Sequence, residues 1–225
     1  MKNAEKLDEV FKRLKSFYAG LNMGLPALSP VDMLVQTIIS QNNTDVNTLK
    51  TFAKLKKRFK SWDELLAARD KELEELLKES GLYRSKTKYI KNALRKMKED
   101  FADFTLSPLK KMRDEEARSW LLSIKGIGPK TAGVVLAFSL GKPSFPVDTH
   151  VQRVITRLGI VPEGTSREKV QKLLEATVAQ RKQAIFHTLL INHGKSICKA
   201  RKPLCLKCPL SDICPSKKLY YPKIE

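Results

Sequence analysis

The chain has 225 residues, 42% hydrophobic and 30% charged, a composition typical of a folded protein that buries a core without disulfide bonds. Its charge is unusual, because 43 Lys and Arg against 24 Asp and Glu leave a formal net charge of +19. Such an excess favours a polyanionic partner, most often nucleic acid, although Lys-rich solvated surfaces would give the same count. No stretch approaches the roughly 20 apolar residues that span a membrane, and the first residues lack a signal-peptide pattern. We therefore expect a cytoplasmic monomer, associated with the nucleoid in a prokaryote, with no membrane partner.

Apolar residues recur at three- and four-residue spacing nearly throughout, and no stretch of useful length alternates as a strand would, so the sequence predicts an all-α fold. The first helix is expected at 7–17, and a loop at 21–30 follows it. Ser29 can cap the second helix, which ends near 40–43, and Thr44 can cap the third. Further helices are expected at 46–59, 61–69, 70–79, 85–100, 107–124, 129–140, from Asp148 onward, at 166–179 and at 181–193. The tail from Cys198 is expected to be irregular.

The segment Lys125-Gly126-Ile127-Gly128 separates two of these helices. Two glycines at i and i+2 allow a sharp reversal, because glycine accepts positive φ, and their missing side chains let another backbone approach. Pro129 suits the first position of the next helix, whose free N–H groups then point outward at the positive end of the helix dipole. The pattern predicts a helix–hairpin–helix motif that clamps DNA phosphates. A tight helical corner that binds nothing is the alternative.

All four cysteines lie close together, within 17 residues of a proline-rich tail: Cys198, Cys205, Cys208 and Cys214. Clustered cysteines in a cytosolic protein are more often metal ligands than disulfides. A structural zinc site usually pairs two C-x-x-C or C-x-x-H units, and this tail has one such unit. The segment is therefore expected to wrap a bulky metal group, with zinc as the alternative.

Three stretches resemble the endonuclease III family of helix–hairpin–helix DNA glycosylases. The hairpin matches the family's G-x-G-x-K-T-A pattern, the segment that begins Val147-Asp148-Thr149-His150 matches V-D-T-H-x-x-R-V, and the segment 81–86 is similar to G-L-Y-x-S-K. The resemblance covers about residues 25 to 215. It implies two α-helical domains with a DNA-binding cleft between them. One is a six-helix barrel at 23–142, and the other joins 1–22 to 143–225 and carries an iron–sulfur loop.

The resemblance implies a bifunctional DNA glycosylase and abasic-site lyase of base-excision repair, acting on double-stranded DNA that contains damaged bases or abasic sites. A carboxylate stabilises the positive charge that base loss leaves on the sugar, and an amine that attacks C1′ forms a Schiff base from which β-elimination cuts the strand. Lys130 corresponds to the family's nucleophile, and Asp148 to its carboxylate. The helix dipole lowers the pKa of an amine in a first turn. Without the resemblance, Lys130 would be one of many surface lysines and Asp148 a plain helix cap.

The resemblance also implies a duplex wedge, because the damaged base must leave the helix. In the family a side chain from a Ser-x-Gln-x-Thr-Asp turn fills the gap, and the corresponding turn here is Ser40-Gln41-Asn42-Asn43-Thr44-Asp45. The family's glutamine aligns with Asn42, whereas Gln41 falls one position early, so either residue could be the wedge. A plain helix terminus is the alternative. The other residues expected at DNA are Gly126, Gly128, Lys130, Lys199 and Arg201.

The spacing of the cysteines is that of the family's [4Fe–4S] cluster, which implies this cofactor rather than zinc. Lysines and arginines between and beside the four ligands suggest that the cluster orders a DNA-binding loop. His187 and His193 lie in an apolar helical stretch and are expected to pack or hydrogen-bond rather than bind metal, and His150 is assigned no role.

The sequence leaves two other functions open. One is a mismatch-type glycosylase of the same superfamily, although those relatives lack the lysine or add a C-terminal domain. The other is a non-catalytic helix–hairpin–helix DNA-binding protein, which would need neither Lys130 nor Asp148. Family membership suggests oxidised or ring-saturated pyrimidines as the bases removed.

Overall fold

The computed structural model describes residues 3–20 and 28–221, and helices are the only regular secondary structure in these residues. The all-α prediction is therefore confirmed. The chain divides into two compact units, the central unit Pro26–Lys142 and the terminal unit, which joins Met1–Leu25 to Pro143–Glu225. The loop predicted at 21–30 lies outside the described residues except for 28–30. No helix in the described ranges is long and apolar enough to cross a membrane.

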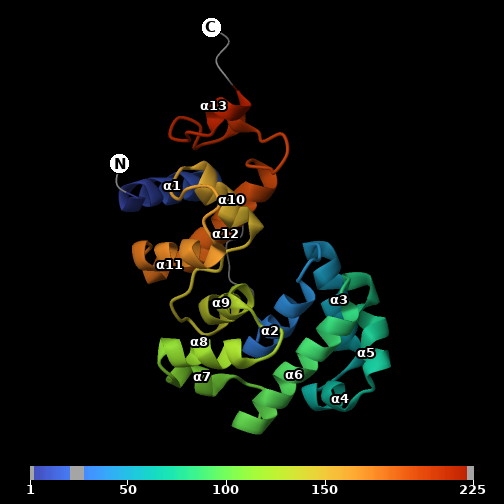
Figure 1. Cartoon of the computed structure of the whole chain (residues 1–225). Helices are drawn as coiled ribbons and strands as arrows, with labels where there is room; N and C mark the ends of the chain where they lie inside the picture. The colour runs from blue at the N-terminus through green and yellow to red at the C-terminus, as the bar shows by residue number, and fades with distance from the viewer. Residues whose placement is uncertain (1–2, 21–27, 222–225) are drawn as a thin grey trace. The chain divides into compact units, whose positions relative to one another are not determined.

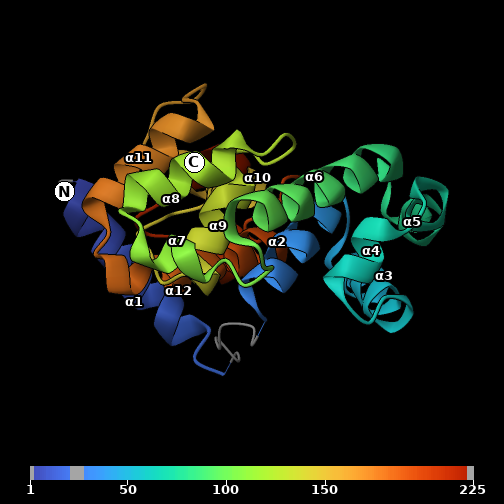
Figure 2. The ribbon, with the colours of Figure 1, turned by 90° about the horizontal axis from the view of Figure 1, so that it is seen from below.

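The central unit packs around three helices that share its core. Its elements are α2 (Pro30–Ile39), α3 (Asp45–Arg58), α4 (Trp62–Ala67), α5 (Asp70–Leu77), η1 (Lys78–Ser80), α6 (Tyr83–Phe101), α7 (Ser107–Lys111), α8 (Asp114–Ser123) and α9 (Pro129–Ser139). Leu34 and Ile38 of α2 are fully buried, as are Leu94 of α6 and Leu136 of α9. Helix α2 packs against α3, α6 and α9. In Figure 1 and Figure 2, α6 has α4 and α5 on one side and α7 and α8 on the other.

Side-chain caps define where several of these helices begin. The Ser29 hydroxyl accepts a hydrogen bond from the backbone N–H of Asp32 at 3.2 Å, and the Thr44 hydroxyl accepts one from Asn47 at 3.3 Å. Both caps satisfy an N–H group that has no partner within its helix. The two caps predicted from the sequence are thus confirmed, and the Thr44 cap marks the end of the turn between α2 and α3.

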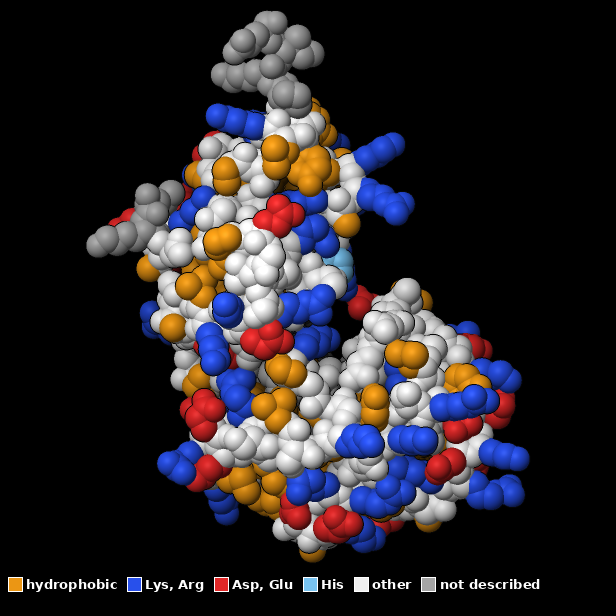
Figure 3. All heavy atoms as spheres, viewed as in Figure 1, with side chains coloured by type: hydrophobic (Ala, Val, Ile, Leu, Met, Phe, Trp, Pro, Cys, Tyr) orange, Lys and Arg blue, Asp and Glu red, His pale blue; other side chains and the backbone are white. Residues whose placement is uncertain are grey.

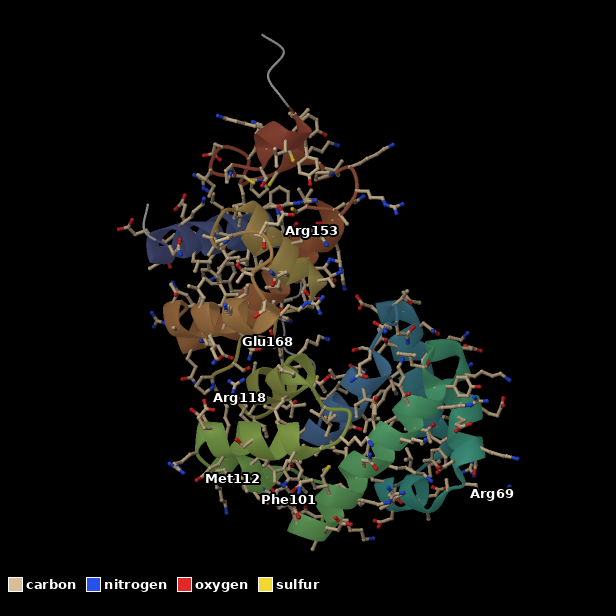
Figure 4. All side chains as sticks on the ribbon, viewed as in Figure 1. Arg69, Phe101, Met112, Arg118, Arg153 and Glu168 are labelled. Atoms are coloured by element: carbon tan, nitrogen blue, oxygen red, sulfur yellow. The ribbon has the colours of Figure 1, made fainter. Side chains whose placement is uncertain are left out.

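The prediction of a single helix at 107–124 is wrong, because the helical conformation is interrupted between α7 and α8. Met112 and Arg113 are extended, with ψ angles of 156° and 154° (Figure 4 labels Met112). The Arg113 backbone N–H donates to Glu116 at 3.1 Å, and three acidic residues occupy the first turn of α8. Carboxylates stabilise a helix N-terminus, so they favour a new start here although no glycine or proline marks the break.

The terminal unit is built around its longest helix, α12. Its elements are α1 (Asn3–Phe17), α10 (Thr149–Arg157), α11 (Arg167–Thr177), α12 (Gln180–Ser196), η2 (Cys205–Lys207) and α13 (Lys217–Tyr220). Helix α12 packs against α1 and α10 (Figure 1). Phe186 of α12 is fully buried, and its ring meets Phe11 and Phe145 edge-on at centroid distances of 5.4 and 5.8 Å. Between Cys198 and Tyr221 the chain is mostly irregular, as predicted, apart from η2 and α13.

Candidate active site and iron–sulfur site

The hairpin between α8 and α9 requires glycine at Gly126. Its φ is +101°, and a Cβ built there would lie 2.1 Å from the ring of Tyr89. Ile124 and Ile127 on either side are buried at 2% and 5% exposure and anchor the hairpin to the core of the central unit. Gly126 thus serves both the reversal of the chain and the close packing of the hairpin on α6.

Gly128 differs from the expectation that both glycines need positive φ. Its backbone is extended, with φ −97° and ψ 177°, and no atom of the described chain lies within 4 Å of where its Cβ would be. An alanine would be accommodated without strain, so the fold itself does not explain this glycine. Because Gly128 has no side chain, a ligand can approach the start of α9 from outside the protein.

Lys130 is the second residue of α9, directly after the exposed Gly128 and Pro129, and is itself half-buried. The N–H groups of a first helical turn have no acceptor within the helix and carry the positive end of its dipole. A phosphate is favoured there. Lys130 thus lies where the sequence places it, in the first turn of a helix that follows the hairpin, and its role as nucleophile stays a prediction.

Asp148 lies in the terminal unit and caps α10. Its Oδ1 atom accepts hydrogen bonds from the backbone N–H groups of His150 at 2.9 Å and Val151 at 2.8 Å. Two backbone donors on one oxygen hold the carboxylate in a single orientation. The capping role expected for Asp148 is present, and its catalytic role stays a prediction.

Arg153, one turn further along α10, ties this helix to the end of α12 (Figure 4). Its guanidinium donates to the carbonyl of Gly194 at 2.7 Å and to that of Cys198 at 2.9 Å, and it contacts Nδ1 of His150 at 3.1 Å. Burial lowers the pKa of Arg153 from its ordinary value. The helix that Asp148 caps is thus fixed to the backbone of the first cysteine. The sequence assigned His150 no role, and here it is part of this packing.

The turn between α2 and α3 separates the two candidate wedge residues. The Gln41 amide donates to the carbonyl of Gly126 at 3.2 Å and contacts the Thr131 hydroxyl at 3.4 Å, so it is bound to the hairpin. Asn42 is exposed and has a left-handed φ of 49°. Asparagine tolerates this conformation better than most residues. Asn42 therefore lies at the tip of the turn, and Gln41 at its base.

Leu82 is a candidate contact residue that was not identified from the sequence. It is 55% exposed and has a φ of 50°, uncommon for a leucine. A Cβ on the preceding Gly81 would lie 4.0 Å from the carbonyl oxygen of Asn42, so the two turns touch. Apolar side chains of this kind insert between base steps in many DNA-binding proteins. The sequence did hold one indication of this role, because Leu82 is an apolar residue inside a predicted Gly-Leu-Tyr turn.

The four cysteines surround one hollow in the terminal unit. Its volume is about 430 Å³, part of it open to solvent, and Val154, His193 and Tyr220 also line it. All four thiols are half-buried and none forms a disulfide. Among the described residues, no group of three or more His, Cys, Asp or Glu side chains is placed to hold a metal ion. All four cysteines nevertheless border the same hollow.

Donors around the thiols match thiolates bound to metal. Arg157 Nη1 lies 3.4 Å from Cys198 Sγ, and the Leu210 backbone N–H lies 3.4 Å from Cys208 Sγ. Hydrogen bonds to cluster sulfurs tune and stabilise such sites. Burial raises the pKa of the Cys208 thiol to about 11, so metal binding must displace its proton. The residues present therefore fit an iron–sulfur cluster.

The histidines of α12 are hydrogen-bonded and buried, as predicted. His187 Nδ1 contacts the carbonyl of Pro146 at 2.8 Å, and His193 Nδ1 contacts the Tyr18 hydroxyl at 3.3 Å. His193 also lies 3.5 Å from Cys208 Sγ through Nε2, which places it beside the cysteines rather than among them.

Exposed cations lie between and beside the cysteines. Lys199, Arg201, Lys202 and Lys207 are all exposed. Figure 3 shows Lys and Arg side chains extending from the surface of both units. The iron–sulfur loop, residues 198–214, thus presents positive charge to solvent, as the sequence predicts.

Comparison with known proteins places these features in a family. Residues 35–180 match the model of the HhH-GPD superfamily base excision DNA repair protein, and residues 198–214 match that of the iron-sulfur binding domain of endonuclease III. The chain is 35% identical to endonuclease III of Synechocystis sp. over 94% of its length and 93% of the relative, and 31% identical to that of Bacillus subtilis over 95% and 94%. It also matches a solved structure of a trapped endonuclease III–DNA covalent intermediate, with a TM-score of 0.84 and 27% identity over 97% of this chain and 99% of that one.

The helical fold and the hairpin define a member of the HhH-GPD superfamily of base-excision DNA repair proteins. Within that superfamily the chain belongs to the endonuclease III family, whose members are DNA glycosylases and abasic-site lyases. It binds DNA, and it carries a [4Fe–4S] cluster.

Proposed function

We propose that this enzyme excises the damaged base and cuts the strand through Lys130, with Asp148 as the catalytic carboxylate. The observation that carries the proposal is the position of Lys130 in the first turn of α9, next to the open hairpin at Gly128 and Pro129. A phosphate held by the first-turn N–H groups would bring the neighbouring sugar within reach of this amine. The similarity to an endonuclease III trapped as a covalent intermediate with DNA supports the same chemistry.

The reaction proceeds through a covalent intermediate on Lys130. The neutral Lys130 amine attacks C1′ while the damaged base leaves with the bonding electron pair and takes up a proton. The sugar ring opens to a Schiff base between Lys130 and C1′. Loss of a proton from C2′ and departure of the 3′ phosphate then cut the strand by β-elimination. Water hydrolyses the Schiff base and regenerates the lysine.

Asp148 stabilises the positive charge that develops on the sugar as the base departs. A fixed carboxylate does this without reorganising during the reaction, and the two backbone N–H groups on its Oδ1 atom provide that fixation. The tie from Arg153 to the Cys198 backbone keeps the helix behind it rigid.

The duplex is opened by Asn42 and Leu82, which lie exposed at the tips of two touching turns. Gln41 supports the turn from below, because its amide is bound to Gly126. The hairpin glycines contact phosphates, as do Lys199 and Arg201 of the iron–sulfur loop. Asn42 is therefore the wedge residue that we propose, and the bond from Gln41 to the hairpin supports this choice.

The cluster ligands are Cys198, Cys205, Cys208 and Cys214, the residues that line the hollow. When bound, the cluster supplies structural order to the loop that carries the cations. Lys199 and Arg201 then meet the DNA backbone at fixed positions. The chain's own part is to hold the thiolates with Arg157 and the Leu210 N–H.

The substrates we propose are oxidised or ring-saturated pyrimidines and abasic sites in double-stranded DNA, processed by the monomer. They place the enzyme with the chromosome, at the nucleoid if the cell is a prokaryote. A panel of duplexes with one lesion each tests this. Release of saturated pyrimidines ahead of mismatched normal bases is expected, and preference for a mismatched thymine or adenine would favour the mismatch-type alternative.

The lyase mechanism is tested by borohydride trapping on a duplex with one abasic site. Wild type is expected to give a covalent adduct and Lys130→Gln none. Lys125→Gln, an exposed lysine of the same hairpin, is the matched control and is expected to retain the adduct. No adduct from wild type would favour a non-catalytic DNA-binding protein, and an adduct from Lys130→Gln would overturn the assigned nucleophile.

A further inference from the structure

Lys86 is a buried cation whose two acceptors are both backbone carbonyls. It lies in the first turn of α6, and its residue exposure is 0%. Its Nζ donates to the carbonyl of Ser80 at 2.6 Å and to that of Ile39 at 2.8 Å. Burial lowers the pKa of the ammonium to about 8. A buried amine is costly, so its position calls for an explanation beyond packing.

The two carbonyls belong to the residues that precede the two exposed turns. Ile39 is the last residue of α2, and the turn with Asn42 follows it. Ser80 is the last residue of η1, and Gly81-Leu82 follow it. Asn42 and Leu82 have nearly the same left-handed φ, 49° and 50°. One ammonium therefore links the base of both turns.

A second set of bonds spans the same gap from α3. The Asn47 amide donates to the carbonyl of Glu79 at 2.6 Å and to the Asn43 side chain at 3.0 Å. The Asn43 amide reaches the carbonyl of Ile39 at 3.4 Å, the acceptor that Lys86 uses. The two turns thus form one hydrogen-bonded body, with Lys86 as its fully buried member.

We propose that Lys86 is a positioning residue that sets the spacing between Asn42 and Leu82, so that the two side chains enter the duplex as one rigid wedge. The proposal rests on the proposed function, because it assumes that these residues open the duplex. An apolar side chain at this position would remove the Lys86 donor from both carbonyls and leave only the longer Asn43 bond on that of Ile39, so the spacing between the turns would be held less firmly. The amine is used because it reaches both acceptors at once.

A residue that only positions the wedge should affect the opening of the duplex and not the chemistry at the sugar. Excision of a base from a duplex needs the wedge, since the base must be extruded and the gap filled. Schiff-base formation at an abasic site in a single strand does not. Loss of the tie is therefore expected to reduce the first reaction and spare the second.

Lys91 offers a matched control on the same helix. It is also buried, at 5% exposure, and donates to the backbone carbonyl of Ala68 and to Asp70. Lys91→Met removes a buried lysine bonded to a carbonyl, as Lys86→Met does, but it leaves both turns untouched. A general loss of stability would affect both variants.

The experiment compares the cluster-loaded wild type, Lys86→Met and Lys91→Met. Three readouts are measured: single-turnover excision from a dihydrouracil duplex, borohydride trapping on a single-stranded abasic oligonucleotide, and fluorescence of a 2-aminopurine beside the lesion on binding. For Lys86→Met we expect excision to fall by on the order of tenfold or more and the 2-aminopurine rise to be lost, with single-strand trapping within about twofold of wild type. Lys91→Met is expected to match wild type in all three.

Several results would overturn the proposal: equal loss on duplex and single strand, an equal duplex defect in Lys91→Met, or no defect in Lys86→Met. The 2-aminopurine signal does not depend on the chemistry. If wild type gives no adduct but its fluorescence rise needs Lys86, the nucleophile assignment fails and the wedge role stands. If Lys86→Met does not fold, Lys86→Gln, whose shorter amide cannot reach both carbonyls, is measured under the same criteria.

Discussion

Gly126 and Gly128 lie two residues apart in the hairpin and differ in what a side chain would meet. A Cβ on Gly126 would overlap the Tyr89 ring in a backbone with positive φ, whereas one on Gly128 would meet nothing. We expect Gly126→Ala to lower the free energy of unfolding by roughly 1–3 kcal/mol. Gly128→Ala should change it by less than about 0.5 kcal/mol. Urea denaturation measures both, and equal effects would contradict the account of this hairpin.

Gly128→Ala tests the phosphate site without disturbing the fold. Its methyl group would project into the space through which a phosphate reaches the first-turn N–H groups of α9. We expect affinity for an abasic duplex to fall by about tenfold, the equivalent of losing one charge-assisted hydrogen bond. Fluorescence anisotropy at fixed salt measures it. Unchanged affinity would show that DNA does not approach α9 at this position.

The lowered pKa of Lys86 predicts a pH-dependent stability. The folded state releases the proton near pH 8, whereas the unfolded chain keeps the ordinary value of 10.5, so the unfolded state binds more protons between these pH values. Rising pH therefore stabilises the folded state of wild type relative to Lys86→Met, by up to about 1.4 kcal/mol per pH unit in this window. Denaturation of both proteins at pH 7.5 and pH 10 measures the difference. A constant difference would mean that the lysine keeps its ordinary pKa.

The sequence supplied candidates for the catalytic and wedge residues, but not the contacts that distinguish one candidate from another. Gln41 and Asn42 were equivalent candidates, because the bond that distinguishes them joins Gln41 to Gly126, 85 positions along the chain. Lys86 was identified only as part of a motif, since its two carbonyls come from different segments. Local patterns carry information about caps and turns, whereas such long-range ties depend on how the helices pack.

At the scale of elements, the short helix α13 closes over the iron–sulfur loop. The Tyr220 hydroxyl accepts a hydrogen bond from Arg157 at 2.7 Å, and the Arg157 guanidinium lies 4.7 Å from its ring centroid. Arg157 also donates to the carbonyls of Lys199 and Ala200, and the Tyr221 hydroxyl donates to that of Pro203. Tyr220 and Tyr221, which follow the last cysteine, therefore help to hold the segment 199–203, which follows the first cysteine.

This closure predicts that Tyr220 protects the cluster. We expect Tyr220→Ala to speed aerobic loss of the cluster's visible absorbance on the order of tenfold, because the hollow opens and Arg157 loses a partner. Tyr220→Phe keeps the ring and is expected to fall between wild type and Tyr220→Ala. Leu219→Ala, a 79% exposed residue of the same helix, is the control and should behave as wild type. Equal loss rates in all four proteins would contradict a protective role.

Element prediction succeeded where a local chemical feature marks a boundary. Ser29, Thr44 and Asp148 each cap the helix that follows, because their side chains accept backbone hydrogen bonds near the start. The break at Met112 was missed because helix-forming residues surround it and an acidic first turn alone restarts the helix. Helix α13 is four residues long and is held by contacts to the loop, so periodicity could not identify it.

At the scale of the molecule, the net charge of +19 predicts salt-sensitive DNA binding. Each phosphate contact releases condensed counterions, which steepens the dependence of affinity on salt. If Lys199 and Arg201 both contact phosphates, replacing both with alanine should reduce the slope of log K against log salt by about 0.9 for each contact. Lys78→Ala, an exposed lysine in the other unit, should leave the slope unchanged. A slope unaffected by the double replacement would remove the iron–sulfur loop from the interface.

The family, the all-α fold and the cluster were accessible from the sequence, because hairpin, Val-Asp-Thr-His and cysteine spacings are local. Composition indicated a polyanionic partner without identifying a nucleophile. The two glycines of the hairpin show what local patterns cannot predict. Their spacing predicts a reversal of the chain, but only the packing on Tyr89 shows that the fold requires Gly126.

The central claim is that the Lys130 amine forms the covalent bond to the sugar. The most direct test is to reduce the adduct of wild type with abasic DNA, digest protein and DNA, and locate the sugar remnant by peptide mass spectrometry. The account predicts the modification on Lys130 alone. A remnant on the amino terminus or on another lysine, such as Lys125 of the same hairpin, would contradict it.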